Sequence, residues 1–383
     1  MPRVVFVVND APFFLSHRLQ LALGVQAAGY DVHVATPEHA RVHEIRSAGL
    51  PFHPIPLLRG TAGAVSDMRG ALGLARLYRW LRPDIVHHVA HKPIILGSLA
   101  ARWVGAPAVV NAISGLGYAF LAEGPKAALR RRLILAGYRA AFNHRRAIGI
   151  FQNPDDVRLF VGRGILRREQ YVIVPGSGVD LTAFRDTPEP PGPPRVVLPA
   201  RMLWDKGVGE FVEAIRQLRA SGLSLRADLV GDTDLANPAA VPIDRLRSWT
   251  EEGVVQWLGH QTDMARIYAE AHIVCLPSYR EGLPKVLLEG AACGRALVAT
   301  DVPGCREIAR EGENAILVRA RESQPLAEAL ARLISDRFLR VRLGRRSREI
   351  AEAEYGVERV IEATLEVYTS FLAPSRGRGI THP

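Results

Sequence analysis

The sequence lacks any long apolar run, and it is poor in cysteine. No stretch of 18 consecutive apolar residues occurs in its 383 residues, so no membrane-spanning helix is predicted. The opening residues, MPRVVFVVNDAP, show no signal-peptide cleavage pattern. The three cysteines, Cys275, Cys293 and Cys305, form no C-x-x-C pair. Such cysteine usage suits a reducing cytoplasm and predicts small buried side chains.

Acidic residues are scarce in one part of the chain. The net charge is +10, yet residues 1–180 hold 22 Lys and Arg against 11 Asp and Glu, and residues 181–383 hold 27 against 28. Residues 126–146 carry seven Lys or Arg and no acid, with apolar residues at helical spacing: Leu129, Leu133, Ile134, Tyr138 and Phe142. Such a helix can bind an anionic membrane surface, or it can pack its apolar stripe on its own domain. Nucleic-acid binding is not predicted, because no basic–aromatic interleaving or known motif accompanies the charge.

Short apolar strands alternate with helical stretches along the whole chain. Strands are predicted at 3–8, 31–36, 52–57, 84–89, 108–113, 147–153, 195–200, 225–231, 254–259, 271–277, 296–300 and 315–318. Helices are predicted at 16–28, 64–82, 126–146, 207–220, 323–335, 337–354 and 357–372. This alternation is typical of a parallel α/β architecture.

Five prolines within residues 186–194 predict a linker between two domains. The expected division is an N-terminal domain over residues 1–185 and a C-terminal domain over residues 195–356. Both are expected to be Rossmann-like, with doubly wound parallel sheets. A helix follows at 357–372, and residues 373–383 are expected to form a disordered tail.

Residues 278–308 contain two glutamates, Glu281 and Glu289, with seven residues between them. A Gly-Leu-Pro turn after Glu281 opens a helix, with Pro284 expected at its first position. The strands at 271–277 and 296–300 make this a parallel crossover, which places the helix start at the carboxyl edge of the sheet. Helix-start N–H groups favour an anion such as phosphate. We expect Glu289 to accept hydrogen bonds from ribose and Glu281 to meet the group beyond the phosphates.

Two cations, Arg201 and Lys206, follow the strand at 195–200 and reach the same edge. There they can neutralise a departing diphosphate. Asp232-Thr233-Asp234 matches a metal-binding D-x-D pattern, but a three-residue match is weak. No metal and no cofactor are predicted. His91 lies past the strand at 84–89, after His87 and His88, and is expected in a loop that contacts sugar or acceptor.

Several motifs together resemble one family. The E-x7-E spacing, ARMLWDKG (200–207), PGSGVD (175–180) and residues 9–36 are similar to segments of the retaining family 4 glycosyltransferases, in the same order. The resemblance covers residues 3 to about 372 and implies the GT-B fold. That fold has two Rossmann-like domains facing a cleft and a C-terminal helix that crosses back to the N-terminal domain.

The resemblance implies a set of site residues. Catalytic roles fall to Glu281, Arg201, Lys206 and His91. The nucleotide sugar would contact Arg201, Lys206, Gly231, Leu258, Gly259, Ser278, Glu281, Gly282, Leu283, Pro284 and Glu289. The acceptor or sugar loop would comprise His91, Ser114, Gly115 and Gly117. Many members carry a histidine where Ser114 stands here, which weakens any role for a catalytic histidine.

The expected activity is retaining transfer of a hexose or N-acetylhexosamine from a UDP-sugar to a polyprenyl-diphosphate-linked glycan, in cell-surface polysaccharide or lipopolysaccharide synthesis. The N-terminal domain would hold the acceptor and the C-terminal domain the nucleotide sugar. The expected location is cytoplasmic, peripherally associated with the inner face of the cell membrane. The alternatives are a GT-B nucleotide-sugar epimerase and a transferase with a soluble acceptor.

Overall fold

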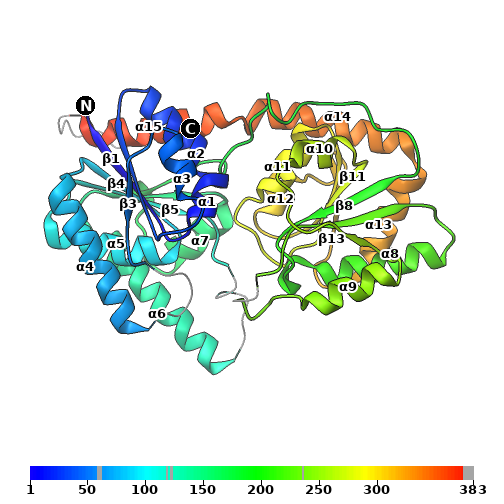
Figure 1. Cartoon of the computed structure of the whole chain (residues 1–383), viewed down its shortest axis with the longest axis horizontal. Coiled ribbons are helices and arrows are strands. Elements are labelled where there is room, and N and C mark those ends of the chain that lie inside the picture. Colours follow the sequence, from blue (N-terminus) through cyan, green and yellow to red (C-terminus); the bar gives the residue numbers. More distant parts are fainter. Residues whose placement is uncertain (58–62, 118–119, 121–123, 235–236, 374–383) are drawn as a thin grey trace. The chain divides into compact units, whose positions relative to one another are not determined.

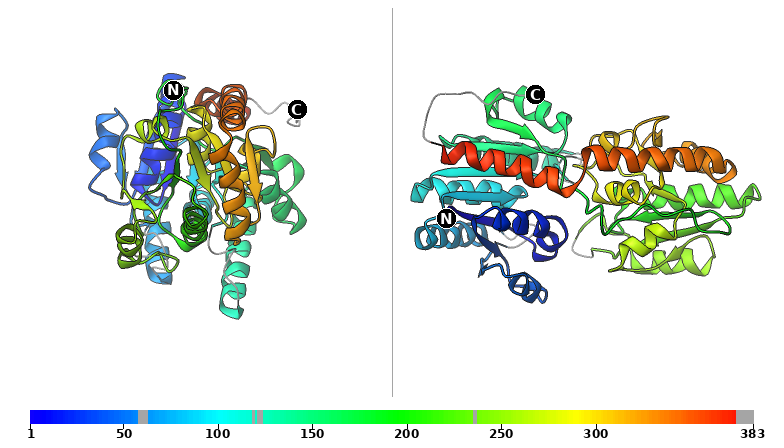
Figure 2. Two further views of the ribbon diagram at one scale, coloured as in Figure 1. Left: turned by 90° about the vertical axis from the view of Figure 1, so that its right-hand side faces the viewer. Right: turned by 90° about the horizontal axis from the view of Figure 1, so that it is seen from above.

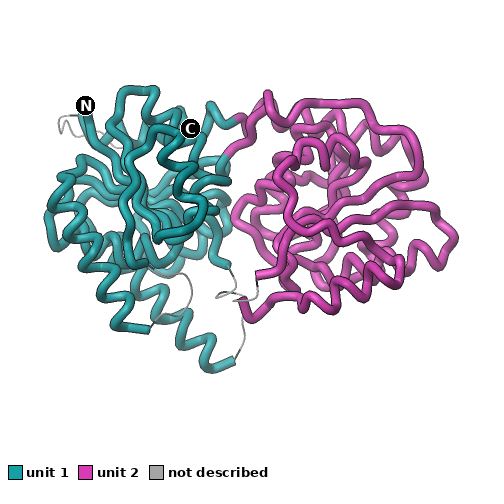
Figure 3. The backbone as a smooth tube through the Cα atoms, viewed as in Figure 1, with its two compact units in different colours: residues 1–177, 357–383 teal, residues 178–356 magenta. Residues whose placement is uncertain are grey.

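The computed structural model describes the chain except for residues 58–62, 118–119, 121–123, 235–236 and 374–383 (Figure 1). The predicted tail lies almost wholly outside the described residues. The chain divides into two compact units, and Figure 2 gives two further views of both. Unit 1 comprises residues 1–177 and 357–383, and unit 2 comprises residues 178–356 (Figure 3).

Unit 1 is built on a parallel sheet of seven strands. Their order is β3 (Phe52–Pro54), β2 (Asp31–Thr36), β1 (Arg3–Val8), β4 (Ile85–Val89), β5 (Ala108–Ile113), β6 (Ala147–Phe151) and β7 (Tyr171–Ile173). Every residue of β4, β5 and β6 is buried. Helices cover both faces of a parallel sheet, which explains why these strands are nearly continuous apolar runs.

Two helical layers enclose this sheet. One face packs against α4 (Ala64–Leu81), α5 (His91–Val104), α6 (Pro125–Phe142) and α7 (Pro154–Gly162). The other packs against α1 (Ala11–His17), α2 (Leu19–Ala27), α3 (Val42–Ser47) and α15 (Val357–Leu372). A 3₁₀ turn (Arg168–Gln170) precedes β7. Although α15 follows unit 2 in the sequence, it lies beside α2 and completes the core of unit 1, as Figure 2 shows from above.

Unit 2 repeats the plan with six parallel strands. Their order is β10 (Gln256–Trp257), β9 (Arg226–Val230), β8 (Arg195–Pro199), β11 (Ile273–Leu276), β12 (Ala296–Thr300) and β13 (Ala315–Val318). One face carries α8 (Val208–Ala220), α9 (Ile243–Glu251) and α13 (Ser323–Ser335). The other carries α10 (Met264–Ala269), α11 (Lys285–Ala292) and α12 (Cys305–Ile308), while α14 (Arg337–Glu354) contributes to both cores. A 3₁₀ turn, Trp204–Lys206, follows β8.

The predicted fold class is confirmed, and the differences are local. The helix predicted at 16–28 is two helices that meet at Arg18, and the first begins earlier, at Ala11. Its start was readable, because Asp10 caps it by accepting from the Phe13 N–H, and Pro12 stands in its first turn. All three cysteines are buried and free.

The chain enters unit 2 at Gly178, earlier than the proline-rich segment predicts. Side chains of unit 2 hold that segment in place. Arg340 makes a two-pronged ion pair with Glu189, at 2.6 and 3.1 Å, and Arg295 donates to the Thr187 carbonyl at 2.5 Å. The proline-rich run is therefore part of the surface of unit 2.

Candidate functional site

The carboxyl ends of four neighbouring strands define the site in unit 2. The strands β9, β8, β11 and β12 are adjacent, and all pairs are parallel. The loops that follow them therefore meet at one edge: 200–207, 231–234, 277–284 and 301–304. Ligands of doubly wound folds bind at this kind of edge.

Two glycines allow the loops to pack closely. Gly207 has φ +72°, and a Cβ there would lie 2.2 Å from the Pro277 carbonyl oxygen. Gly304 has φ +83°, and a Cβ there would lie 2.5 Å from the Gly282 carbonyl oxygen and 2.8 Å from that of Glu281. No L side chain fits at such distances. The absence of a Cβ at these two positions thus fixes where Lys206 and Glu281 stand.

The structure brings Lys206 and Glu281 together, although 74 residues separate them in sequence. The Lys206 Nζ lies 2.6 Å from Glu281 Oε1, and the two side chains are only 16% and 14% exposed. Shielding from water strengthens both their attraction and any attraction of Lys206 for an incoming phosphate. This pair is the centre of the candidate site.

The two aspartates of the D-x-D pattern turn to different partners. Asp232 accepts a hydrogen bond from the His260 backbone N–H at 3.1 Å, which holds the loop containing Leu258 and Gly259. Asp234 instead pairs with Arg201, with 3.0 Å between Oδ2 and the guanidinium. Within the described residues, no three His, Cys, Asp or Glu side chains are arranged to hold a metal ion. In this structure the two aspartates thus hold two different loops.

Glu289 is held firmly inside unit 2. It is 6% exposed, its Oε2 accepts from the Tyr268 hydroxyl at 2.9 Å, and its Oε1 lies 3.0 Å from Lys285 Nζ. Burial, with the Glu289 charge beside it, raises the pKa of Tyr268 well above its ordinary value, so Tyr268 stays a donor. The prediction that Pro284 opens the helix is off by one residue. Pro284 is the N-cap, and α11 starts at Lys285.

The other residues predicted to contact the nucleotide sugar lie at the same carboxyl edge of the sheet in unit 2. Gly231 donates its N–H to the Gly259 carbonyl at 2.8 Å, which joins the ends of β9 and β10. Leu283 is buried, and the Ser278 side chain is fully buried with its carbonyl accepting from the Thr300 hydroxyl. The Ser278 backbone, and not its hydroxyl, is therefore the part that shapes the edge.

Sequence reasoning missed Lys285 and Tyr268. Lys285 was visible, because it stands four residues before Glu289 on a predicted helix, where opposite charges meet. Tyr268 carried no such signal, since its contact with Glu289 joins α10 to α11 across 21 residues.

In unit 1, the prediction that His91 lies in a loop is wrong. His91 is the first residue of α5. The preceding Ala90 adopts a left-handed backbone, φ +75°, which turns the chain into the helix directly after β4. His91 Nε2 lies 3.0 Å from the Leu116 carbonyl and Nδ1 contacts the Tyr138 hydroxyl. Because a carbonyl only accepts, Nε2 carries the proton and Nδ1 accepts from tyrosine. Burial lowers the pKa of His91 and keeps the ring neutral.

The neighbouring histidines are core residues. His87 contacts the Tyr368 hydroxyl of α15 at 2.6 Å, and His88 lies 2.9 Å from both the Tyr78 hydroxyl and the Asn111 side-chain oxygen. Burial lowers the pKa of His88 to about 4. Ser114 and Gly115 are half-buried and follow β5, next to the β4 end that leads into His91. A Cβ built at Gly117 would lie 4.0 Å from His91 Nε2, so Gly117 lies close to the His91 ring.

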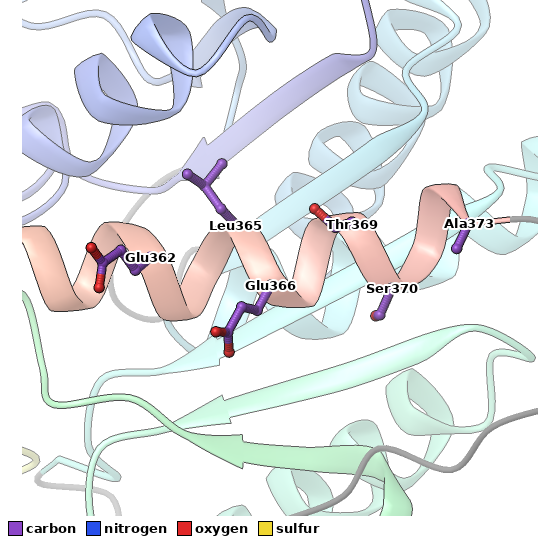
Figure 4. A pocket seen from close by; sticks show the side chains of 6 residues that line it. All are labelled: Glu362, Leu365, Glu366, Thr369, Ser370 and Ala373. Carbon is purple, nitrogen blue, oxygen red and sulfur yellow. The ribbon is translucent and has the colours of Figure 1, made fainter.

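A surface groove of about 590 Å³ runs along α15 (Figure 4). Its lining residues belong to α15, except for the last, which directly follows the helix: Glu362, Leu365, Glu366, Thr369, Ser370 and Ala373. None of them is among the predicted site residues, so the groove is separate from the edges described above.

Two family models match the chain, one in each unit. The model described as "Glycosyl transferase 4-like" matches residues 3–153, and that described as "Glycosyl transferases group 1" matches residues 193–336. The chain belongs to these group 1, family 4-like glycosyltransferases. The resemblance inferred from the sequence is confirmed.

Two curated relatives of this chain carry the names of glycosyltransferases. A Campylobacter jejuni protein named N,N'-diacetylbacillosaminyl-diphospho-undecaprenol alpha-1,3-N-acetylgalactosaminyltransferase is 27% identical over 379 residues, or 96% of this chain and 98% of that protein. The capsular polysaccharide biosynthesis glycosyltransferase CapM of Staphylococcus aureus is 24% identical over 178 residues, 46% of each chain.

Solved structures show the glycosyltransferase fold to be GT-B. Anabaena HepE in complex with UDP and glucose matches with a TM-score of 0.79 at 17% identity, over 97% of this chain and 100% of that one. A Thermosynechococcus elongatus sucrose-phosphate synthase matches with a TM-score of 0.82 at 18% identity, over 97% and 99%. At these identities the match concerns the fold alone.

Proposed function

We propose that this glycosyltransferase moves a hexose or N-acetylhexosamine from a UDP-sugar to a polyprenyl-diphosphate-linked glycan, with retention at the anomeric carbon. The observation that carries the proposal is the shielded Lys206–Glu281 pair at the edge where α11 begins. It sets a cation for the leaving phosphate beside a carboxylate for the sugar hydroxyls.

The donor site is built from one helix start and nearby cations. The first N–H groups of α11 have no partner within the helix and favour an anion. Arg201 and Lys206 belong to the loop after the adjacent strand β8, so they can meet the same diphosphate. Glu289, farther along α11, is the acceptor for the ribose hydroxyls. HepE, a protein of the same fold, was crystallised with UDP and glucose.

Retention is proposed to follow a front-face substitution. The bond between the sugar C1 and the phosphate oxygen breaks, and the acceptor oxygen bonds to C1 on the same face. The acceptor hydroxyl gives its proton to the departing phosphate. Lys206 and Arg201 stabilise the charge that develops on that phosphate, and Glu281 orients the sugar hydroxyls. His91 is not used as a base here, because both its ring nitrogens are engaged within unit 1.

The acceptor is assigned to unit 1 because of its basic surface. In α6, Leu135, Tyr138, Ala141 and Phe142 pack on the core, whereas Leu129 and Leu133 are 60% and 66% exposed. The predicted apolar stripe therefore splits: its last part packs internally and its first part, beside Lys126 and Arg130–Arg132, faces solvent. An apolar and cationic surface of this kind suits an anionic membrane and a lipid-linked diphosphate.

Exposed apolar residues also occur on α4, at Val65, Met68 and Leu72. Helix α5 packs against both α4 and α6, and Figure 1 shows the three side by side. In the described part of the chain, no helix has the length and apolarity to cross a bilayer. We propose a peripheral location at the cytoplasmic face of the membrane, because the exposed apolar and basic surface of unit 1 suits it. The name of the Campylobacter relative includes a lipid-linked compound, a diphospho-undecaprenol.

Nucleotide release tests the function directly. UDP-, GDP- and ADP-sugars are incubated with the enzyme, with and without a bacterial lipid extract, and free nucleoside diphosphate is measured. We expect UDP release that depends on the extract, with an α-linked product by NMR from an α-linked donor. Conversion of the sugar without any extract would instead support the epimerase, and release with a water-soluble oligosaccharide alone would support a soluble acceptor.

The membrane surface is tested with vesicles. We expect the protein to bind anionic vesicles, and to release as salt rises, because the attraction is screened. Changing Arg130, Arg131 and Arg132 to Glu should abolish vesicle binding and leave UDP binding within about twofold, as unit 2 holds the nucleotide.

A matched control reverses three exposed arginines elsewhere in unit 1, at 163, 167 and 168, with the same change of charge. This variant should keep most of its vesicle binding. Equal loss in both variants would show a general charge effect, and the assignment of α6 would then be wrong.

A further inference from the structure

Each cation of the proposed phosphate site is paired with a carboxylate. The pairs are Arg201 with Asp234 at 3.0 Å, Lys206 with Glu281 at 2.6 Å and Lys285 with Glu289 at 3.0 Å. Two of these carboxylates belong to the E-x7-E motif and have roles toward the sugar and the ribose. Asp234 has no such role, so its contact with Arg201 needs a separate explanation.

The Arg201–Asp234 contact differs from the other two in exposure. The Arg201 side chain is 48% exposed and that of Asp234 is 23% exposed, whereas Lys206 and Glu281 are largely shielded. Arg201 donates from Nη1 to Asp234 Oδ2. A half-exposed ion pair contributes little free energy, so its partners exchange easily with a competing charge. The ion pair between Arg201 and Asp234 is therefore weak enough to dissociate when Arg201 meets another anion.

We propose that Asp234 is a positioning residue that holds Arg201 while no donor is bound, competes with the donor's diphosphate for it, and recaptures it when the nucleotide leaves. The proposal rests on the function given above, in which Arg201 binds the diphosphate. A diphosphate offers more negative charge and two-pronged geometry to a guanidinium, so it displaces the carboxylate. The carboxylate then stands near the bound phosphates and repels them.

Two effects of Asp234 oppose each other, and their sizes decide the outcome. Holding Arg201 in place assists binding, but a half-exposed ion pair orders the side chain only weakly. Repulsion acts on the full charge of the diphosphate and persists after Arg201 has moved. We therefore expect the carboxylate to weaken nucleotide binding on balance and to speed product release.

The test is Asp234→Asn, which keeps the shape and removes the charge. By titration calorimetry, UDP should bind about two- to fivefold tighter than to the wild type, the scale of one partly exposed charge. Uridine, which has no phosphate, should bind with unchanged affinity. Inhibition of turnover by added UDP should strengthen by the same factor. GDP and ADP are titrated in parallel, and the tightest binder serves as the probe.

Two further variants separate this proposal from the proposed function. Glu252→Gln removes a carboxylate that likewise pairs with an arginine of the same unit, Arg216, although it is more exposed than Asp234, 42% against 23%. This variant should leave UDP affinity unchanged. In Arg201→Ala, UDP binding should weaken, and adding Asp234→Asn should then give no gain beyond twofold. If Arg201→Ala binds UDP normally, the phosphate role of Arg201 fails, whatever Asp234 does.

The proposal for Asp234 itself is overturned if Asp234→Asn binds UDP equally or more weakly while Arg201→Ala is impaired. A gain that persists in the Arg201→Ala background also overturns it, because it would be a general charge effect. Weaker binding that magnesium restores would assign Asp234 to a metal. A gain for UDP alone, lost without Arg201, is the result that supports the exchange.

Discussion

Replacing Lys206 by alanine is expected to lower kcat by about two to three orders of magnitude, the usual cost of removing a preorganised group that stabilises developing charge. Lys206 is shielded from water and contacts Glu281, so its charge acts on the leaving phosphate with little screening. The loss should fall on kcat more than on KM, because the leaving phosphate gains charge in the transition state. Steady-state transfer kinetics measure it.

Two controls accompany this variant. Lys206→Arg keeps the charge and should recover a substantial part of the activity, while a thermal melt checks that each variant is folded. Activity should also survive EDTA, since protein cations serve the phosphate. A variant that raises KM and leaves kcat intact would remove Lys206 from the catalytic step. Full loss in EDTA, restored by magnesium, would revive a metal role for Asp232 and Asp234.

Removing the charge of Glu289 is expected to weaken nucleotide binding by on the order of 1–3 kcal/mol, the scale of a lost hydrogen bond to a charged group. Glu289→Ala and the closer mimic Glu289→Gln should both show the loss. Calorimetric titration should find it for UDP and for uridine alike, because the carboxylate is assigned to the ribose. Binding of inorganic pyrophosphate should be unaffected.

The comparison variant is Tyr268→Phe. It removes the hydroxyl that holds Glu289 Oε2 and keeps the carboxylate. Its loss of uridine affinity should be smaller than that of Glu289→Gln. If Glu289→Gln binds both UDP and uridine with unchanged affinity, Glu289 does not contact the ribose. The interpretation of the E-x7-E motif as a nucleotide-sugar site would then be wrong for this chain.

The crossover around Glu281 and Glu289 could be predicted because every signal in it is local. The strands are apolar runs, the Gly-Leu-Pro turn separates strand from helix, and burial of α11 follows from its own residues. The helix start differs by a single residue. Short-range propensity and the rule for the carboxyl edge of a parallel sheet were sufficient to predict this crossover and the edge at which its helix begins.

The partners within the site could not be predicted, because they join distant parts of the chain. Lys206 reaches Glu281 across 75 positions, and Arg201 reaches Asp234 across 33. The helical start at His91 depends on the left-handed backbone of Ala90, a conformation that an alanine in a sequence does not suggest. Tertiary packing supplies the energy for that conformation, so only the folded structure reveals it.

The proline-rich run is a second case in which local sequence could not predict a long-range contact. Its composition is that of a linker, and nothing local contradicts this. The ion pair of Glu189 with Arg340 spans 151 positions and ties the run to unit 2. Composition indicates the conformation that a segment prefers in isolation. Ion pairs with distant residues determine whether the segment is held against a folded unit.

The return of α15 to unit 1 has a consequence for synthesis of the chain. Val360, Val367, Tyr368 and Phe371 complete one core face of unit 1, and Tyr368 contacts His87 inside it. A ribosome delivers these residues only after all of unit 2. Domains usually fold in the order in which they are made. Here one apolar face of unit 1 must stay uncovered until the whole of unit 2 has been synthesised.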